Sequence, residues 1–322
     1  MKKFLKKPMF FCQIFGLIVL EVSLFVYYQN SSFTPNQVKI GVTYMTMNNE
    51  FYNALNEEIE KEVLAKGDQL ILRDPALDVS KQVQQVKSFV RQGVDIIIIN
   101  PVDSSNKELI DELRRAKEAG LGIVVVDSQL TDAKFVDTTI LSDNYKAGVL
   151  CAEHLLSSTD NAKILLLEHA STVSGSERIK GFLETLEGHE NYKIVARKEV
   201  QGQTEIAMPA VQEVIESGVV FDTIMALNDK AALGALAALE EEGDTGKVAI
   251  YGIDGSPDMK NLLATTSEVQ ATVTQTPYTM GEEAVAASYR ILTGKKQDKL
   301  VLTPVTLLDQ NNINDYDVTG WQ

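Results

Sequence analysis

The feature of this sequence that most constrains its fold is a regular alternation of short apolar runs with amphipathic segments. Runs such as Val94–Ile99 and Ile123–Val126 are mostly apolar, which is typical of parallel strands buried on both faces. The segments between them carry apolar residues at helical spacing, as in the valines at positions 79, 83, 86 and 90. Repeated β-α units of this length predict an α/β fold of parallel sheets flanked by helices.

An internal repeat predicts two lobes built to one plan. Asn228 follows Asn100 by 128 residues, and each ends an apolar run. Asp254 follows Asp127 by 127 residues in the same way, and a third pair of predicted strands repeats at a similar spacing. Matching elements at nearly one period indicate a duplicated unit. We therefore expect two similar doubly wound parallel-sheet lobes.

The polar residues at these strand ends predict a ligand site. Ligands of open α/β sheets bind outside the carboxyl ends of the strands. If the two lobes face each other, Asn100, Asp127, Asn228 and Asp254 converge on one cleft. Carboxylates accept hydroxyl hydrogen bonds and amides both donate and accept, so the set suits a ligand rich in hydroxyls. The alternative is that these residues cap the helices that follow them.

The N-terminal sequence predicts a membrane anchor. Four lysines precede an apolar run from Met9 to Tyr28, about the ~20 residues that a helix needs to cross a bilayer. The lysines favour a cytoplasmic N-terminus, which places the rest of the chain outside the cell. No small-x-small cleavage site follows the run, so we expect an uncleaved single-pass helix; the alternative is a cleaved signal peptide.

Two residues of this run deserve separate interpretations. Glu21 is a carboxyl inside an apolar segment, which predicts either contact with another helix or a tolerated protonated side chain. Cys12 follows Met-Phe-Phe, which does not resemble a lipoprotein signal, so we interpret it as a small apolar residue. Residues 1–37 then form a Lys-rich tip, an anchor and a polar linker.

Composition argues against several classes of function. The chain has 30 Lys plus Arg against 45 Asp plus Glu, a net charge of -15, so nucleic acid is not an expected partner. The two cysteines and three histidines show no metal spacing, and no glycine-rich nucleotide loop follows a strand, so no metal or cofactor is predicted. An enzyme would need a nucleophile with a base or a paired carboxylate; Asp127 and Asp254 as a glycosidase pair remain a remote alternative.

Together the motifs resemble the type I periplasmic sugar-binding proteins, the ribose-binding-protein family, whose fold also forms the sensor core of LacI-type repressors. The resemblance covers about residues 38–305, through segments such as IIIINPVDS, VVVDSQ, MALNDKAALGAL and YGIDGSPD. It implies a sugar ligand, with polar contacts and with ring stacking on the two aromatics of the opening loop. The implied ligand-binding residues are Asn49, Phe51, Tyr52, Asn100, Asp127, Asn228, Asp254 and Gln275.

Departures from the family pattern concern its arginines and aromatics. Ser128 stands where ribose binders have an arginine. The family's second sugar-contacting arginine aligns with Ser176, while Arg178 matches a neighbouring arginine, and all three are candidate ligand residues. Gln201 and Gln203 replace an expected aromatic. These changes alter which hydroxyl pattern is recognised, so ribose is not the expected ligand.

The resemblance also implies a domain division and a function. We expect an N-terminal lobe over residues 38–141 plus 277–303 and a C-terminal lobe over 142–276 plus 304–322, joined by a three-stranded hinge. The chain would deliver a monosaccharide or polyol to a sugar ABC transporter permease. The alternative is a membrane-anchored sugar sensor that regulates a two-component histidine kinase. A repressor is excluded by the apolar segment where a DNA-binding head would stand.

Overall fold

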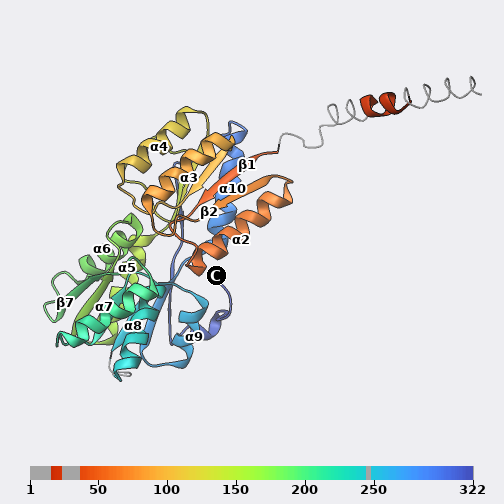
Figure 1. The fold of residues 1–322 in the computed structure, drawn as a ribbon. Helices are drawn as coiled ribbons and strands as arrows, with labels where there is room; N and C mark the ends of the chain where they lie inside the picture. Colours follow the sequence, from red (N-terminus) through yellow and green to blue (C-terminus); the bar gives the residue numbers. More distant parts are fainter. Residues whose placement is uncertain (1–15, 24–36, 244–247, 322) are drawn as a thin grey trace, which may run out of the picture. The chain divides into compact units, whose positions relative to one another are not determined.

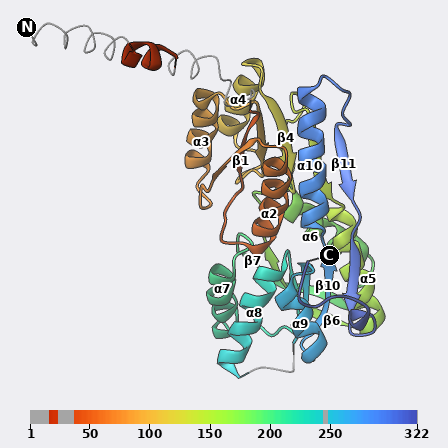
Figure 2. The same ribbon diagram turned by 90° about the vertical axis from the view of Figure 1, so that its right-hand side faces the viewer.

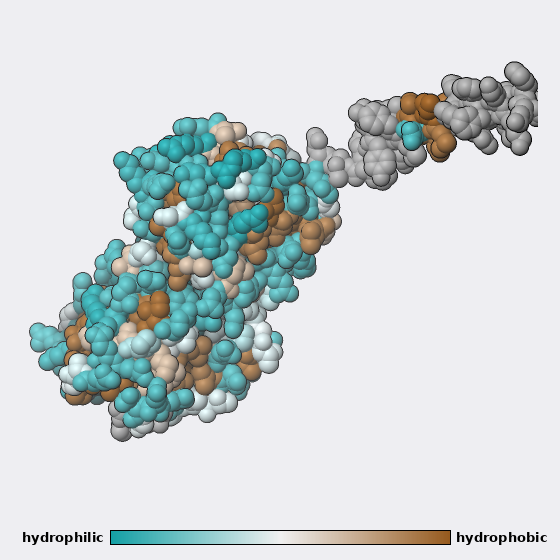
Figure 3. Space-filling model, in the orientation of Figure 1, coloured by the Kyte–Doolittle hydropathy of each residue, from teal (hydrophilic) through white to brown (hydrophobic). Residues whose placement is uncertain are grey.

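The computed structural model describes residues 16–23, 37–243 and 248–321. The chain divides into one unit of residues 1–38 and a second unit of residues 39–322. In the first unit, residues 16–23 are helical and their apolar side chains are exposed (Figure 3). The rest of the predicted anchor over Met9–Tyr28 lies outside the described residues. None of the helices in the described ranges combines the length and apolar character that crossing a bilayer requires.

The second unit contains two α/β lobes, so the expectation of two parallel-sheet lobes is confirmed (Figures 1 and 2). The N-terminal lobe has a six-stranded sheet in the order β11-β5-β4-β3-β1-β2, with every pair parallel. Its strands are β1 (Lys39–Thr43), β2 (Gln69–Arg73), β3 (Ile96–Ile99), β4 (Gly122–Val126), β5 (Thr138–Ser142) and β11 (Leu300–Thr303). Its helices are α2 (Glu50–Ala65), α3 (Val79–Gln92), α4 (Lys107–Glu118) and α10 (Pro277–Leu292).

The C-terminal lobe repeats this plan, with strand order β12-β10-β9-β8-β6-β7. Only β12 differs, because it pairs antiparallel with β10. The strands are β6 (Ala162–Glu168), β7 (Tyr192–Glu199), β8 (Thr223–Ala226), β9 (Ala249–Asp254), β10 (Val269–Thr274) and β12 (Thr306–Asp309). The helices are α5 (Asn144–Ser158), α6 (Val173–Leu186), α7 (Thr204–Glu216), α8 (Asp229–Glu242), α9 (Pro257–Thr265) and the short 3-10 helix η1 (Ile313–Asp315).

Each lobe has its own apolar core between its sheet and its helices. In β3 all four isoleucines are buried, and Ile97 and Ile99 pack with the apolar residues of α3 and α4. Because side chains alternate along a strand, Ile96 and Ile98 lie on the other face of the sheet, where α2 and α10 pack together. A strand between two helix layers is therefore apolar along its whole length, which explains the continuous runs in the sequence.

Three short connections join the two sheets. The chain leaves β5 at Ser142 and enters α5 at Asn144, and it leaves β10 at Thr274 and enters α10 at Pro277. The third connection runs between β11 and β12, from Thr303 to Thr306. Asp127 and Asp254, at the carboxyl ends of β4 and β9, both line one cavity. These two strand ends therefore face the same space between the lobes.

Candidate functional site

Two aspartates with unusual backbone conformations mark the site. Asp127 follows β4 with a φ of 63°, and Asp254 ends β9 with a φ of 148°. Both are 4% exposed. Positive φ is costly for residues other than glycine and concentrates at functional sites. Of the five such residues in the described ranges, Asp127, Gln201 and Asp254 all line the cavity.

Asp127 is held by two hydrogen-bond donors of its own lobe. Tyr52 Oη donates to Asp127 Oδ2 over 3.0 Å, and Asn100 Nδ2 donates to the same oxygen over 3.1 Å. Asn100 is itself oriented by Met45, whose backbone N–H donates to Asn100 Oδ1 over 3.0 Å. Burial raises the pKa of Asp127, while nearby Arg178 and the two donors oppose that rise.

The surroundings of Asp254 stabilise its ionised form less than those of Asp127 do. Gln275 Nε2 donates to Asp254 Oδ1 over 2.7 Å. A second buried carboxyl, Asp229, lies close behind, where it accepts from Ser256 N and Thr272 Oγ1. Burial raises the pKa of Asp254 to about 8; Arg178 opposes this, and the carboxylate of Asp229 adds to it.

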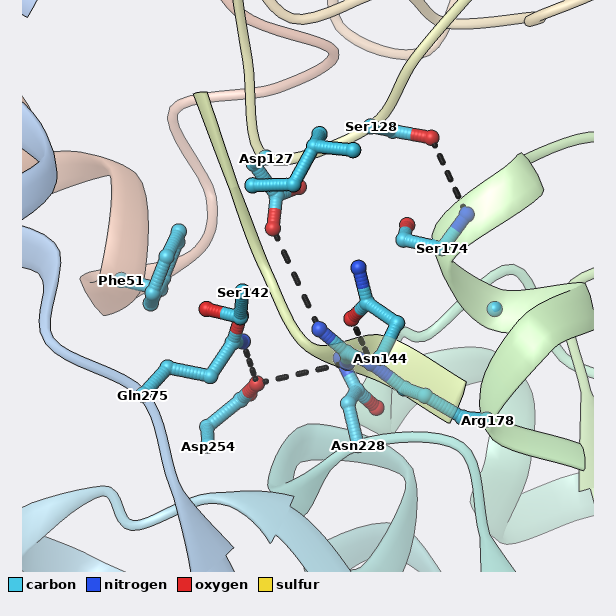
Figure 4. Close-up of polar contacts among 12 residues, drawn as sticks. Phe51, Asp127, Ser128, Ser142, Asn144, Ser174, Arg178, Asn228, Asp254 and Gln275 are labelled. Atoms are coloured by element: carbon cyan, nitrogen blue, oxygen red, sulfur yellow. Dashed lines mark hydrogen bonds and ion pairs between the residues drawn. The ribbon is translucent and has the colours of Figure 1, made fainter. Parts of the chain in front are cut away.

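Arg178 places its guanidinium between these carboxyls (Figure 4). Its Nη1 lies 3.5 Å from Asp254 Oδ1, and its Nη2 lies 3.9 Å from Asp127 Oδ1. The residue is 4% exposed, and its side chain is fixed from behind: Nε donates to Asn144 Oδ1 over 2.8 Å, and Nη1 donates to Leu227 O over 3.0 Å. Arg178 is thus a rigid cation placed between the two lobes.

Close packing of α5 against α6 sets the position of Arg178. A Cβ atom on Gly148 of α5 would lie 1.8 Å from the carbonyl oxygen of Arg178, and one on Gly181 of α6 would lie 2.1 Å from that of Tyr145. Only glycine allows the helix backbones to approach this closely. The approach brings Asn144, at the start of α5, within hydrogen-bonding distance of the guanidinium.

The cavity that these groups surround has a volume of about 30 Å³. Eight of the predicted ligand residues line it: Asn49, Phe51, Tyr52, Asp127, Arg178, Asn228, Asp254 and Gln275. Eight further lining residues were not predicted as ligand residues: Met45, His169, Thr172, Ser174, Gln201, Gly202, Gln203 and Leu227. Most of these lie on loops and helix starts, which carry no periodic signal; the replaced aromatic at Gln201 and Gln203 was the one available indication.

Three predicted ligand residues do not line the cavity. Asn100 is fully buried behind Asp127 and orients it. Ser128 is also fully buried, and its Oγ accepts from the backbone N–H of Ser174. Ser176 is exposed, and its Oγ donates to Ala170 O. On α6, residues 174 and 178 lie one turn apart on the cavity face, so residue 176 points away from it.

The helix-capping alternative holds for part of the set. Asn49 caps α2 by accepting from Phe51 N, and Asn228 caps α8 by accepting from Ala231 N. Asn228 Nδ2 also donates to Gly202 O, and both asparagines still line the cavity. Asp127 and Asp254 cap no helix, so their side chains are available to the cavity.

Aromatic rings form one wall of the cavity. Phe51 and Tyr52 meet edge to face with their centroids 5.5 Å apart, and Trp321 packs against Phe51 at 5.7 Å. Trp321 belongs to the C-terminal stretch that follows β12, so this contact places that stretch close to the site. Apolar ring faces of this kind suit the C–H faces of a sugar.

Hydrogen bonds also join the lobes directly at the rim of the cavity. Ser104 Oγ accepts from Val173 N over 3.1 Å, and Ser128 Oγ accepts from Ser174 N over 3.2 Å. Both donors are N–H groups in the first turn of α6, which have no partner within the helix. A further hydrogen bond between the lobes runs from Asn48 Nδ2 to Glu205 Oε1 over 2.8 Å. The lobes are therefore in contact around the cavity.

Comparisons with known proteins agree with the two-lobed fold. A family model described as periplasmic binding protein domain matches residues 40–296. The ribose import binding protein of Bacillus subtilis is 30% identical over 308 residues, which cover 91% of this chain and 98% of that protein.

Solved structures show the same fold. The binding protein of an arabinose ABC transporter from Shewanella, bound to L-arabinofuranose, is 27% identical with a TM-score of 0.80 over 86% of this chain and 94% of that one. A solute binding protein from Bacillus halodurans with bound myo-inositol has a TM-score of 0.81 over 88% of this chain and 98% of that one; at 23% identity it supports the fold alone.

Proposed function

We propose that this chain, which belongs to the type I periplasmic sugar-binding protein family, binds one monosaccharide or related polyol between its two lobes. The observation that carries the proposal is that Asp127 and Asp254 reach one cavity from opposite lobes, with Arg178 between them. Buried, pre-positioned charged groups form the stronger hydrogen bonds to hydroxyls. The aromatic wall of Phe51 and Tyr52 supplies the apolar contact.

The size of the cavity supports a hinge mechanism. A volume of about 30 Å³ holds a few water molecules at most. A monosaccharide can reach Asp127 and Asp254 only if the lobes move apart and then close again, at a slightly wider separation. A ligand that touches both lobes favours the closed form by its differential affinity for that form.

The three connections between the sheets support the division into lobes given by residues 38–141 plus 277–303 and 142–276 plus 304–322. Each connection is short, and α10 packs on α2 of the N-terminal lobe although it follows β10 of the C-terminal lobe. Rotation at the connections after Ser142, Thr274 and Thr303 would open the cleft with little change inside each lobe.

The names of the relatives suggest that the bound sugar is passed to a membrane transporter. The Bacillus subtilis relative is named as an import binding protein, and the Shewanella relative as the binding protein of an ABC transporter. We infer that this chain is a binding protein and not an enzyme, and that its closed form is recognised by a sugar ABC transporter permease. The apolar run Met9–Tyr28 supports an uncleaved single-pass anchor, with the binding lobes outside the cell.

A sensor is the second candidate, and the N-terminal sequence favours it. Cys12 lacks the surroundings of a lipid-attachment site, and Glu21 places a carboxyl within the apolar run, as expected of a helix that contacts another membrane protein. In this case the closed form would regulate a two-component histidine kinase. The neighbouring genes distinguish the two: a permease pair supports import, and a sensor kinase supports sensing.

Calorimetry combined with small-angle scattering tests the binding proposal. We expect the free protein in solution to be mainly open, and we expect saturable binding of at least one monosaccharide or cyclitol, with a radius of gyration smaller than that of the open form. An unchanged radius with binding established by calorimetry would contradict hinge closure. Absence of binding across the panel, or turnover of a glycoside, would contradict the proposed function itself.

The anchor has its own test. We expect N-terminal sequencing of the mature protein to begin at or near Met1, and the protein to sediment with membranes. A mature sequence that starts after Tyr28 would show that the apolar run is removed.

A further inference from the structure

The cavity is surrounded by more acidic than basic groups. Its charged lining residues are Asp127, Asp254 and Arg178, and the carboxyl of Asp229 lies directly behind Asp254. His169 also lines the cavity, and burial lowers its pKa, which favours the neutral imidazole. One guanidinium therefore faces three buried carboxyl groups, although charge in such surroundings is costly unless it is paired.

Arg178 compensates this charge only from a distance. Its separations from the carboxylate oxygens, 3.5 Å and 3.9 Å, exceed the ~2.7–2.9 Å of charge-assisted hydrogen bonds. Its Nε and Nη1 already donate to Asn144 Oδ1 and Leu227 O. Because these bonds fix the guanidinium from behind, it cannot turn to one carboxylate without losing them.

Three acceptor atoms of the site have no hydrogen-bond donor among the described residues. Asp127 Oδ1 and Asp254 Oδ2 accept none, because the donors to these carboxylates reach the other oxygen of each. Gln275 Oε1 is buried and also accepts none, and the bond from Gln275 Nε2 to Asp254 fixes the orientation of that amide. The acceptors come from both lobes, and a fully buried acceptor such as Gln275 Oε1 is normally satisfied.

On the basis of the proposed sugar-binding function, we propose that the ligand is a polyol that carries a protonated primary amine, as in an amino sugar or an aminocyclitol. An ammonium group donates three hydrogen bonds and carries one positive charge, whereas a hydroxyl donates one bond and carries none. An ammonium can thus pair with more of these acceptors than a hydroxyl can, and its charge offsets the excess of acidic groups. The remaining hydroxyls meet Asn49, Asn228 and the aromatic wall.

The protonation of Asp254 gives this proposal a second readout. With its pKa raised to about 8, Asp254 carries a proton at about pH 7 in the free protein. A bound ammonium would favour the ionised carboxylate and so release this proton to the solvent. A neutral polyol has no charge with which to displace it.

Calorimetry on the full-length protein with matched ligand pairs tests the proposal. The pairs are D-glucosamine with D-glucose, D-galactosamine with D-galactose, D-mannosamine with D-mannose, and an inosamine with its parent inositol. At about pH 7 we expect one amino member to bind about tenfold or more tightly than its parent. Repeating the titration in buffers of different ionisation enthalpy should show proton release for that member. Its N-acetyl derivative, which has no charge, should lose the advantage.

Two variants locate the effect. Asp254→Asn removes the charge and keeps the shape, so it should abolish both the preference for the amine and the proton release. Asp258→Asn, at an exposed position in the first turn of α9, should retain both. Thermal melting establishes that each variant is folded. If every neutral parent binds as tightly as its amino partner, the amine proposal is wrong while sugar binding stands; if no member of any pair binds, both proposals fail.

Discussion

Asp127 and Asp254 occupy matching places in the two lobes, yet their surroundings differ. Each lies at the carboxyl end of the third strand in the strand order of its sheet, at positive φ, and each is 4% exposed. Asp127 receives two hydrogen bonds, from Tyr52 and Asn100. Asp254 receives one, from Gln275, and has the carboxyl of Asp229 beside it. The two lobes thus share the position of the carboxyl group but not its electrostatic environment.

The difference in surroundings gives the two aspartates different roles. Hydrogen bonds from two donors stabilise the ionised form of Asp127, which makes it a fixed acceptor. Asp254 is destabilised as an ion by burial and by Asp229, so its protonation responds to whatever enters the cavity. Both carboxyls share the guanidinium of Arg178, so its loss should alter both of them most strongly.

Arg178→Met should therefore have the largest effect. It leaves both carboxylates without a buried cation, and breaking a buried charge pair typically costs ~3–5 kcal/mol. We expect the free energy of unfolding to fall by about this amount at alkaline pH, where the carboxyls are ionised, and by less at acidic pH, where they are protonated. Denaturant unfolding at both pH values measures it. Arg91→Met, at an exposed position of α3, is the control, and an equal loss in the two variants would contradict the assigned role of Arg178.

Helix packing in the two lobes offers the next comparison. Gly148→Ala places a Cβ 1.8 Å from a backbone carbonyl oxygen, whereas Gly281→Ala, between α10 and α2, meets its nearest atoms at 3.0 Å. We expect Gly148→Ala to lower the free energy of unfolding by ~1–3 kcal/mol and to weaken ligand binding, because α5 carries Asn144. Gly281→Ala should stay within ~1 kcal/mol of the parent. Comparable losses in both variants would show that the α5–α6 approach has no special tightness.

The pH dependence of stability should distinguish the two aspartates. A carboxyl whose pKa is higher in the folded than in the unfolded protein contributes stability at low pH, and this is lost as the pH rises through the folded value. For Asp254 the loss extends to about pH 8, with Arg178, Asp127 and Asp229 as the charged neighbours.

Melting temperatures of the unliganded protein between about pH 5 and pH 9 give the measurement. The difference between each variant and the parent isolates one carboxyl from other titrating groups. We expect Asp254→Asn to flatten the decline more than Asp127→Asn does. A larger effect of Asp127→Asn would contradict the conclusion that Asp254 is the aspartate more strongly destabilised as an ion.

The smallest effect should come from α6. Ser176→Ala removes an exposed hydroxyl that faces away from the cavity, so ligand affinity should change by less than about twofold. Ser128→Ala removes a hydroxyl that joins the lobes and should weaken binding modestly, through closure. Titration of both variants with one ligand is sufficient. A greater loss in Ser176→Ala would restore it as a ligand residue.

The sequence allowed the two lobes and the position of both aspartates to be predicted, because apolar periodicity and strand ends are local signals. It did not separate residues that face the cavity from those one layer behind. Asn100 and Asp127 both follow buried strands, but only the fold shows that the first orients the second. Similarly, the choice between Ser176 and Arg178 depends on the face of α6 turned to the cavity, and this is set by contacts with α5.

The most direct test of the account is the affinity of one bound sugar or amino sugar for the parent protein and for two variants, Asp127→Ala and Asp254→Ala. If both lobes hold the ligand through these carboxyls, each substitution should cost ~1.5–3 kcal/mol, or roughly 10- to 100-fold in affinity. Asp258→Ala, at an exposed position, should bind like the parent. Unchanged affinity in both cavity variants would contradict the placement of the ligand between the lobes.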